Sequence, residues 1–222
     1  MPTLFRDRSD AGRQLAKDLE VLLGVRPQPA PLVLALPRGG VPVAREIARA
    51  FGSPLDVLVA RKIGIPGQPE VGIGAIAGED PPLFDQRALA MLDITAEELA
   101  PDVARERTEL HRREALYRRG RPAPDLAGRT VILVDDGLAT GVTARAALRL
   151  IRARGPDRLV LAVPVGAAGA ASELSHEVDH LLCLHRPHDF RAVGLWYEDF
   201  DQVTDQEVID CLEQQQSVSG TA

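Results

Sequence analysis

Cysteine, long apolar runs and aromatic side chains are all scarce in this chain of 222 residues. Its two cysteines, Cys183 and Cys211, show neither metal-site spacing nor a disulfide framework, which disfavours a secreted disulfide-rich domain and a zinc module. No stretch approaches the roughly 18 consecutive apolar residues of a membrane-spanning helix, and the first seven residues lack the apolar segment of a signal peptide. We therefore expect a cytoplasmic protein with no membrane partner.

Positive charge is also in deficit. The chain has 26 lysines and arginines against 32 acidic residues, for a formal net charge of −6 at pH 7. Nucleic-acid binding depends on clustered cations, and neither a basic arm nor a helix-turn-helix is visible. We expect no nucleic-acid partner, so an anionic ligand would have to be held by a local group of cations and backbone donors.

Predicted strands and helices alternate along most of the chain. Apolar segments typical of buried strands are followed by segments with helical spacing of leucine and alanine. The strands are predicted at about 32–36, 55–60, 73–77, 130–134, 158–163 and 178–184. This alternation predicts an α/β fold with a mainly parallel central sheet flanked by helices, and ligands of such folds bind at the carboxyl ends of the strands.

The chain is expected to form a single domain with two additions to its core. Two helical segments rich in arginine and glutamate interrupt the alternation and predict a helical insertion or flap. A later segment with the only tryptophan would form a hood over the site, and the glutamine-rich end is expected to be disordered. The predicted ranges are 31–78 and 126–184 for the core, 80–125 for the insertion, 185–214 for the hood and 215–222 for the disordered tail.

The strongest chemical signal follows the predicted strand 130–134. Asp135 and Asp136 stand side by side there, and adjacent carboxylates repel each other unless a cation such as Mg²⁺, or a donor such as a vicinal diol, meets them. The small turn 139–143 can direct backbone N–H groups toward a phosphate at the start of the next helix. Together they predict a ribose 5-phosphate site. The alternative is a ligand-free turn whose acids cap the helix or pair with an arginine such as Arg145.

This segment resembles the binding motif for 5-phosphoribosyl 1-pyrophosphate (PRPP) of the type I phosphoribosyltransferases. The resemblance implies that Asp135 and Asp136 contact the ribose hydroxyls, directly or through Mg²⁺. It also implies an enzyme with Mg²⁺ as cofactor that transfers the phosphoribosyl group to a nitrogen acceptor, with a nucleobase expected, and releases pyrophosphate. The residues implied to hold the 5-phosphate are Ala139, Thr140, Gly141, Val142 and Thr143.

Two upstream segments match the same family. Arg38, Gly39 and Gly40 follow the first core strand, where family members bind pyrophosphate with a glycine-rich loop that often contains a strained or cis peptide. The loop 61–72 has the place of the family's flexible catalytic loop, and its Arg61 and Lys62 would neutralise the leaving pyrophosphate. The alternative is a solvated hairpin with two exposed cations, since the Ser-Tyr pair of several subfamilies is missing.

The acceptor site is the part that the sequence determines least. Trp196 and Tyr197 could stack on a base while Asp199 reads its edge. The alternative, which we slightly favour, is that Trp196 and Phe200 seal the core beneath the C-terminal helix. A rival function is a non-catalytic regulator that binds PRPP or a nucleotide on the same fold. The identity of the acceptor, and the choice between a monomer and a homodimer, stay open.

Overall fold

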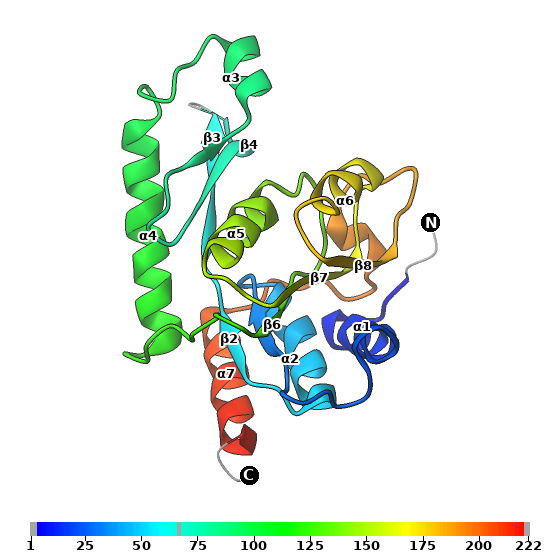
Figure 1. The fold of residues 1–222 in the computed structure, drawn as a ribbon. Helices are drawn as coiled ribbons and strands as arrows, with labels where there is room; N and C mark the ends of the chain where they lie inside the picture. The colour runs from blue at the N-terminus through cyan, green and yellow to red at the C-terminus, as the bar shows by residue number, and fades with distance from the viewer. Residues whose placement is uncertain (1–3, 66–67, 220–222) are drawn as a thin grey trace.

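The computed structural model describes residues 4–65 and 68–219. A five-stranded parallel sheet with helices on both faces forms the body of the molecule, and a second, three-stranded antiparallel sheet lies beside it (Figure 1). The predicted α/β class is therefore confirmed. The elements are α1 (Arg8–Leu23), β1 (Leu32–Ala35), α2 (Gly40–Phe51), β2 (Leu55–Val57), β3 (Ala60–Ile65), β4 (Gln68–Ala77), β5 (Leu83–Phe84), α3 (Gln86–Leu92), α4 (Ala100–Arg118), β6 (Thr130–Val134), α5 (Val142–Ala153), β7 (Arg158–Val165), α6 (Ala168–Leu174), β8 (His180–His185), the 3₁₀ helix η1 (Val193–Trp196) and α7 (Asp205–Ser219).

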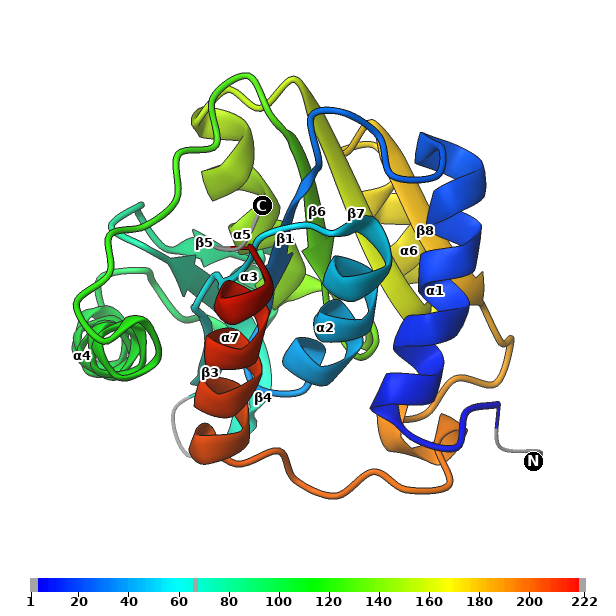
Figure 2. The same ribbon diagram turned by 90° about the horizontal axis from the view of Figure 1, so that it is seen from below.

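The parallel sheet has the strand order β2-β1-β6-β7-β8. Because successive side chains of a strand point to opposite faces, each strand feeds two hydrophobic cores. On β6, Ile132 and Val134 pack with residues of α1, α2 and α7, whereas Val131 and Leu133 pack with residues of α5. Figure 2 shows α1, α2 and α7 along one face of the sheet and α5 and α6 along the other. The same alternation of faces continues beyond the end of β6, at the next two residues, Asp135 and Asp136.

An arm of the molecule contains β3, β4, β5, α3 and the long helix α4 (Figure 1). The predicted strand 73–77 exists as the second half of β4, but it pairs with β3 and β5 rather than with the central sheet. The prediction of a loop over 61–72 is also wrong where the structure describes it. Strands β3 and β4 pair there from Ala60↔Ala77 to Ile65↔Gln68, and a shift of register at Gly64 accommodates the glycines that suggested a loop.

The C-terminal helix α7 extends further than the sequence suggests. It runs to Ser219 and so enters the segment 215–222 for which a disordered tail is expected, and residues 220–222 lie outside the described residues. Gln215 is buried and its side-chain amide donates to the carbonyl of Ser53 at 3.1 Å. This hydrogen bond attaches the helix to the body at a position that composition alone marks only as polar.

Cys183 and Cys211 both carry free thiols. Within residues 4–65 and 68–219, no helix combines the length and the apolar character needed to cross a bilayer.

Candidate active site

The two acids after β6 face opposite sides of the sheet. Asp135 continues the face of Leu133 and lines a cavity on the side of α5, and Asp136 continues the face of Val134 toward α1. One carboxylate oxygen of Asp135 accepts a hydrogen bond from the backbone N–H of Asp136 at 2.8 Å. The pair is therefore two separate carboxylates in different surroundings, not one symmetric ligand.

Asp136 has a cationic partner that the sequence did not reveal. The Nε of Arg8, in the first turn of α1, donates to Oδ2 of Asp136 at 2.9 Å, and the two side chains are only 11% and 16% exposed. Arg145, the partner considered from the sequence, instead pairs with Glu173 and Glu177. Arg8 lies 128 positions from Asp136, and no motif around it marks it as part of a site.

Burial raises the pKa of both carboxyl groups, but the two differ in what opposes it. For Asp135 burial acts first and the charge of Asp136 acts in the same direction, so that its pKa lies well above the ordinary value. For Asp136 the charge of Arg8 and its hydrogen bond counteract part of the effect of burial. The negative charge that the fold compensates less is thus that of Asp135, where a cation or a hydroxyl donor would be stabilised.

The turn after the acid pair frames a cavity of about 310 Å³ at the start of α5. Gly141 caps this helix with φ of 73°, a conformation that glycine adopts at little cost. The backbone of Leu138 joins the turn to β7 by donating to Val165 and accepting from Ala167, both at 2.9 Å. An anion in the cavity would meet the positive end of the helix dipole. The lining residues are Lys62, Gly72, Asp135, residues 137–144 and Val193.

The loop Pro37–Gly40 lies against the acid pair at the end of β1. A Cβ added to Gly39 would come within 1.9 Å of Oδ2 of Asp136, and one added to Gly40 within 2.7 Å of the carbonyl oxygen of Val134. Both glycines are therefore required by close approach. The Pro37–Arg38 peptide bond is cis.

The Arg38 side chain pairs with α7, through an acid that a tyrosine of the arm also contacts. Its Nη1 lies 3.6 Å from Oδ1 of Asp205, the first residue of α7, and the same oxygen accepts the hydroxyl of Tyr117 at 2.6 Å. Burial raises the pKa of Tyr117 to about 12, so its hydroxyl keeps its proton and acts as the donor. Asp205 and Tyr117 were not anticipated from the sequence, because they come from separate helices with no shared motif.

The two predicted catalytic cations lie on opposite faces of β3, as neighbours on a strand do. Lys62 lines the cavity beside Asp135, and its alkyl chain packs so closely on Gly72 that an added Cβ there would lie 2.5 Å from Cδ of the lysine. Arg61 turns instead to α4, where its Nη2 is 2.7 Å from Oε2 of Glu106. The structure brings Lys62 to the site and directs Arg61 away from it.

A family comparison gives this arrangement its context. The family model "Phosphoribosyl transferase domain" matches residues 13–199, which include the acid pair, the helix cap and the glycine loop. The chain belongs to this family. The resemblance found in the sequence at 131–143 and 36–40 is thereby confirmed.

Two relatives show how far the phosphoribosyl transferase likeness extends. Over 210 residues the chain is 44% identical to "Putative phosphoribosyl transferase Rv0571c" of Mycobacterium tuberculosis (strain ATCC 25618 / H37Rv), covering 95% of this chain and 46% of that protein. The chain thus spans about half the length of the curated relatives it matches. It is also 43% identical to the protein TT1426 from Thermus thermophilus, a solved structure with a TM-score of 0.78, covering 95% of this chain and 98% of the other.

The segment expected to form a hood over the base packs instead in the core next to the acid pair. Trp196 and Tyr197 are only 6% and 4% exposed and pack with Phe5 and Val165, so the prediction that their rings stack on a base is wrong. The alternative of core packing is right, although the contacts lie at the start of the chain and not beneath α7. The hydroxyl of Tyr197 donates to the carbonyl of Asp136 at 2.6 Å. Asp199 is exposed and accepts from the backbone of Asp201.

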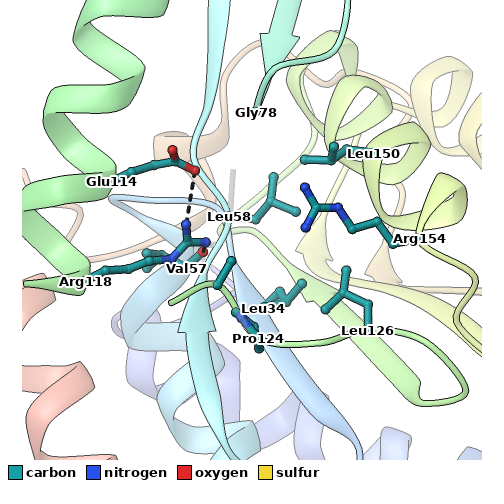
Figure 3. Close-up of a pocket in the computed structure, with 11 residues that line it drawn as sticks. Leu34, Val57, Leu58, Gly78, Glu114, Arg118, Pro124, Leu126, Leu150 and Arg154 are labelled. Carbon is teal, nitrogen blue, oxygen red and sulfur yellow. Dashed lines mark hydrogen bonds and ion pairs between the residues drawn. The ribbon is translucent and has the colours of Figure 1, made fainter. Parts of the chain in front are cut away.

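A second cavity lies between the sheet, α5 and the arm, away from the phosphoribosyl transferase motif (Figure 3). Its floor is made by apolar side chains such as Leu34, Leu58 and Leu150, and at its edge Glu114 pairs with Arg118 at 3.3 Å. The described residues that line it include neither of the two acids nor any residue of the glycine loop or the helix cap. The candidate active site is therefore the cavity at the start of α5.

Proposed function

We propose that the chain binds PRPP together with Mg²⁺ and transfers its phosphoribosyl group to a nitrogen acceptor, with a nucleobase as the first class to test. The observation that carries the proposal is the convergence of three groups at one edge of the sheet. These are Asp135, the helix cap at Gly141 and the close-packed loop at Gly39. They supply an acceptor for ribose hydroxyls, donors for a phosphate and a backbone that a pyrophosphate can approach.

In the proposed reaction the bond between C1 of the ribose and a pyrophosphate oxygen breaks, and its electron pair leaves with the pyrophosphate. The lone pair of the acceptor nitrogen forms the new bond to C1, and the proton lost by that nitrogen passes to water. Asp135 would orient the ribose and stabilise the positive charge that develops on it, while Lys62 would stabilise the charge on the leaving group. This scheme requires no nucleophile from the protein.

The donor set at the acid pair fits Mg²⁺ only in company with the ligand. Carboxylate oxygens suit this ion, which commonly binds through one or two carboxylates together with substrate phosphates. Among the residues that the structure describes, no three His, Cys, Asp or Glu side chains gather into a protein-only metal site. Asp135 would hold the ion or its water, and the bound ion would neutralise pyrophosphate oxygens.

Binding of PRPP is accordingly expected to depend on divalent metal. Isothermal titration calorimetry should give an affinity at least tenfold higher in Mg²⁺ than in EDTA, because among the described residues that line the cavity only Lys62 is cationic and several negative charges must be balanced. Ribose 5-phosphate is the control: it lacks the pyrophosphate, so its affinity should change much less. Equal PRPP affinity in both buffers would remove the metal from the proposal.

Turnover distinguishes the enzyme from the rival regulator. Trp196 and Tyr197 are buried, so a base would have to be held without these rings. A site without stacking rings is also what a PRPP-binding regulator with no acceptor base would have. Pyrophosphate release is to be measured over a panel of purine and pyrimidine bases and simple amines, with Asp135→Asn as the inactive control. Release with one acceptor supports the transferase. Tight PRPP binding without release under any acceptor supports the regulator.

The two cations of β3 are expected to differ in their contribution. Lys62→Ala should lower turnover by about 100-fold while ribose 5-phosphate affinity stays within a few-fold, because the lysine would act on the leaving pyrophosphate. Arg61→Ala is the matched control on the next residue, and it should change turnover less than about threefold because Arg61 pairs with Glu106. Equal losses in the two variants would mean that the arm acts through its fold and not through Lys62.

A further inference from the structure

Arg8 is fixed at the site by three different contacts. Its Nε donates to Asp136 at 2.9 Å, its Nη1 donates to the carbonyl of Asp201 at 2.8 Å, and its guanidinium lies 3.8 Å from the centre of the Phe200 ring. Asp201 and Phe200 belong to the segment between η1 and α7. The first turn of α1 is thus joined to the acid pair through a cation whose position is determined from three sides.

The same cation has a defined electrostatic effect. A charge-assisted contact at 2.9 Å between side chains largely removed from water is little weakened by solvent, unlike an exposed ion pair. Asp136 is further confined by Gly39, whose α-carbon leaves no room for a Cβ beside Oδ2. The Oδ2 atom is therefore enclosed between Arg8 and the glycine loop, and the cavity at the start of α5 is lined by Asp135.

We infer that Arg8 is a positioning residue that serves as the built-in counter-cation of the acid pair, so that a divalent metal is bound at Asp135 only when a ligand brings it. The inference rests on the proposed function only in assigning the metal to Asp135. With Asp136 already paired to Arg8, the acid pair offers a free ion one carboxylate, that of Asp135. One carboxylate holds Mg²⁺ or Mn²⁺ weakly, whereas oxygens of a pyrophosphate ligand would complete the coordination.

The experiment measures metal binding in the absence of PRPP. Mn²⁺ serves as the probe, because the electron paramagnetic resonance signal of the free ion reports how much is bound. The wild-type protein should bind Mn²⁺ only weakly, and Arg8→Gln should bind it at least tenfold more tightly at Asp135, because the positive charge of Arg8 then no longer offsets the negative charge of the neighbouring Asp136. Arg8→Lys keeps the charge and should resemble the wild type. Arg13→Gln, also on α1 but paired with Asp10, is the matched control and should change nothing.

Thermal unfolding provides a second readout, which tests the role of Arg8 even if Arg8→Gln is too unstable for the metal titration. Removing Arg8 should lower the midpoint by about 4–8 °C because Asp136 is left partly buried and unpaired. The double variant Arg8→Gln/Asp136→Asn carries neither charge and should regain at least half of that loss, without the gain in Mn²⁺ binding. A double variant as unstable as Arg8→Gln would show that Arg8 acts through packing alone and would overturn the inference.

The outcomes separate this inference from the proposed function. Tight Mn²⁺ binding by the wild type that Asp135→Asn abolishes, or no gain in Arg8→Gln, overturns the role of Arg8 whatever PRPP does. A gain in Arg8→Gln that Asp135→Asn removes supports the role of Arg8, even in a protein that proves not to bind PRPP. In that case the proposed function fails and the counter-cation stands.

Discussion

Asp135→Asn should weaken PRPP binding by about 2–3 kcal/mol, which is roughly 30- to 150-fold, while leaving the ligand-free protein as stable as before or more stable. The loss reflects one charge-assisted contact to the ribose or its metal. The gain in stability arises because Asp135 is the carboxylate that burial and the charge of Asp136 both disfavour, as its raised pKa indicates. An asparagine of the same shape removes that cost and keeps an oxygen to accept the backbone N–H of Asp136.

The same substitution at Asp136 is expected to have the opposite effect on stability. Asp136→Asn leaves the guanidinium of Arg8, which is largely removed from water, without its counter-ion, and the unfolding midpoint should fall by several degrees. In the ligand-free protein the Asp135 carboxylate is thus expected to lower the free energy of unfolding, and the Asp136 carboxylate is expected to raise it. The sequence gives no reason to expect this difference, because it does not show that Arg8 pairs with Asp136.

Thermal unfolding with and without Mg²⁺ and PRPP measures both effects in one series. A bound ligand raises the midpoint only where its affinity survives, so the shift should nearly vanish in Asp135→Asn. Alanine in place of Thr95, whose hydroxyl accepts a hydrogen bond from the backbone N–H of Glu98 in the arm, is a control that lowers stability without touching the acid pair. An Asp135→Asn protein that is stabilised by the ligand as much as the wild type would contradict the assignment of this site.

The parts of the site that the sequence predicted are those encoded locally. Asp135, Asp136 and the Thr140–Thr143 turn come from one continuous segment, in which a buried strand, a turn and a helix cap each leave a signature in the residue order. Gly39 and Gly40 were found for the same reason. The structure places all of them at one edge of the sheet, which is where the carboxyl ends of parallel strands must meet.

The parts that the sequence missed depend on contacts between distant segments. Arg8 and Asp205 acquire their partners only when α1 and α7 pack on the body of the fold, and each would pass for an ordinary surface charge in the sequence. One signal was nevertheless present: neighbouring residues of a strand point to opposite faces, so Asp135 and Asp136 could not both face the helix α5. The same rule separates Arg61 from Lys62 on β3. For Trp196 the sequence left two alternatives, because an aromatic side chain near a site can stack on a ligand or pack beneath the site, and the slightly favoured one, core packing, is the one found.

Gly40→Ala is expected to lower the free energy of unfolding by about 1–3 kcal/mol and to weaken PRPP binding by more than tenfold. The added Cβ would lie 2.7 Å from the carbonyl oxygen of Val134 and 3.0 Å from the α-carbon of Asp135. Both atoms belong to the backbone, so neither can turn aside as the end of a flexible side chain could. Relief of the clash requires the glycine loop to move away from the end of β6, which separates the proposed pyrophosphate loop from the acid pair.

Gly169→Ala is the matched control for this substitution. Gly169 lies in α6, and a Cβ added there would meet nothing within 4 Å, so the protein should become more stable by about 0.5–1 kcal/mol through the helix preference of alanine. Urea unfolding gives both free energies, and calorimetry with PRPP gives the affinities. A Gly40→Ala variant that lost stability but bound PRPP like the wild type would show that the loop at Gly39 and Gly40 supports the fold without taking part in binding. Loss of both in Gly40→Ala, with neither lost in Gly169→Ala, would mean that close approach of this loop to the acid pair is what forms the site.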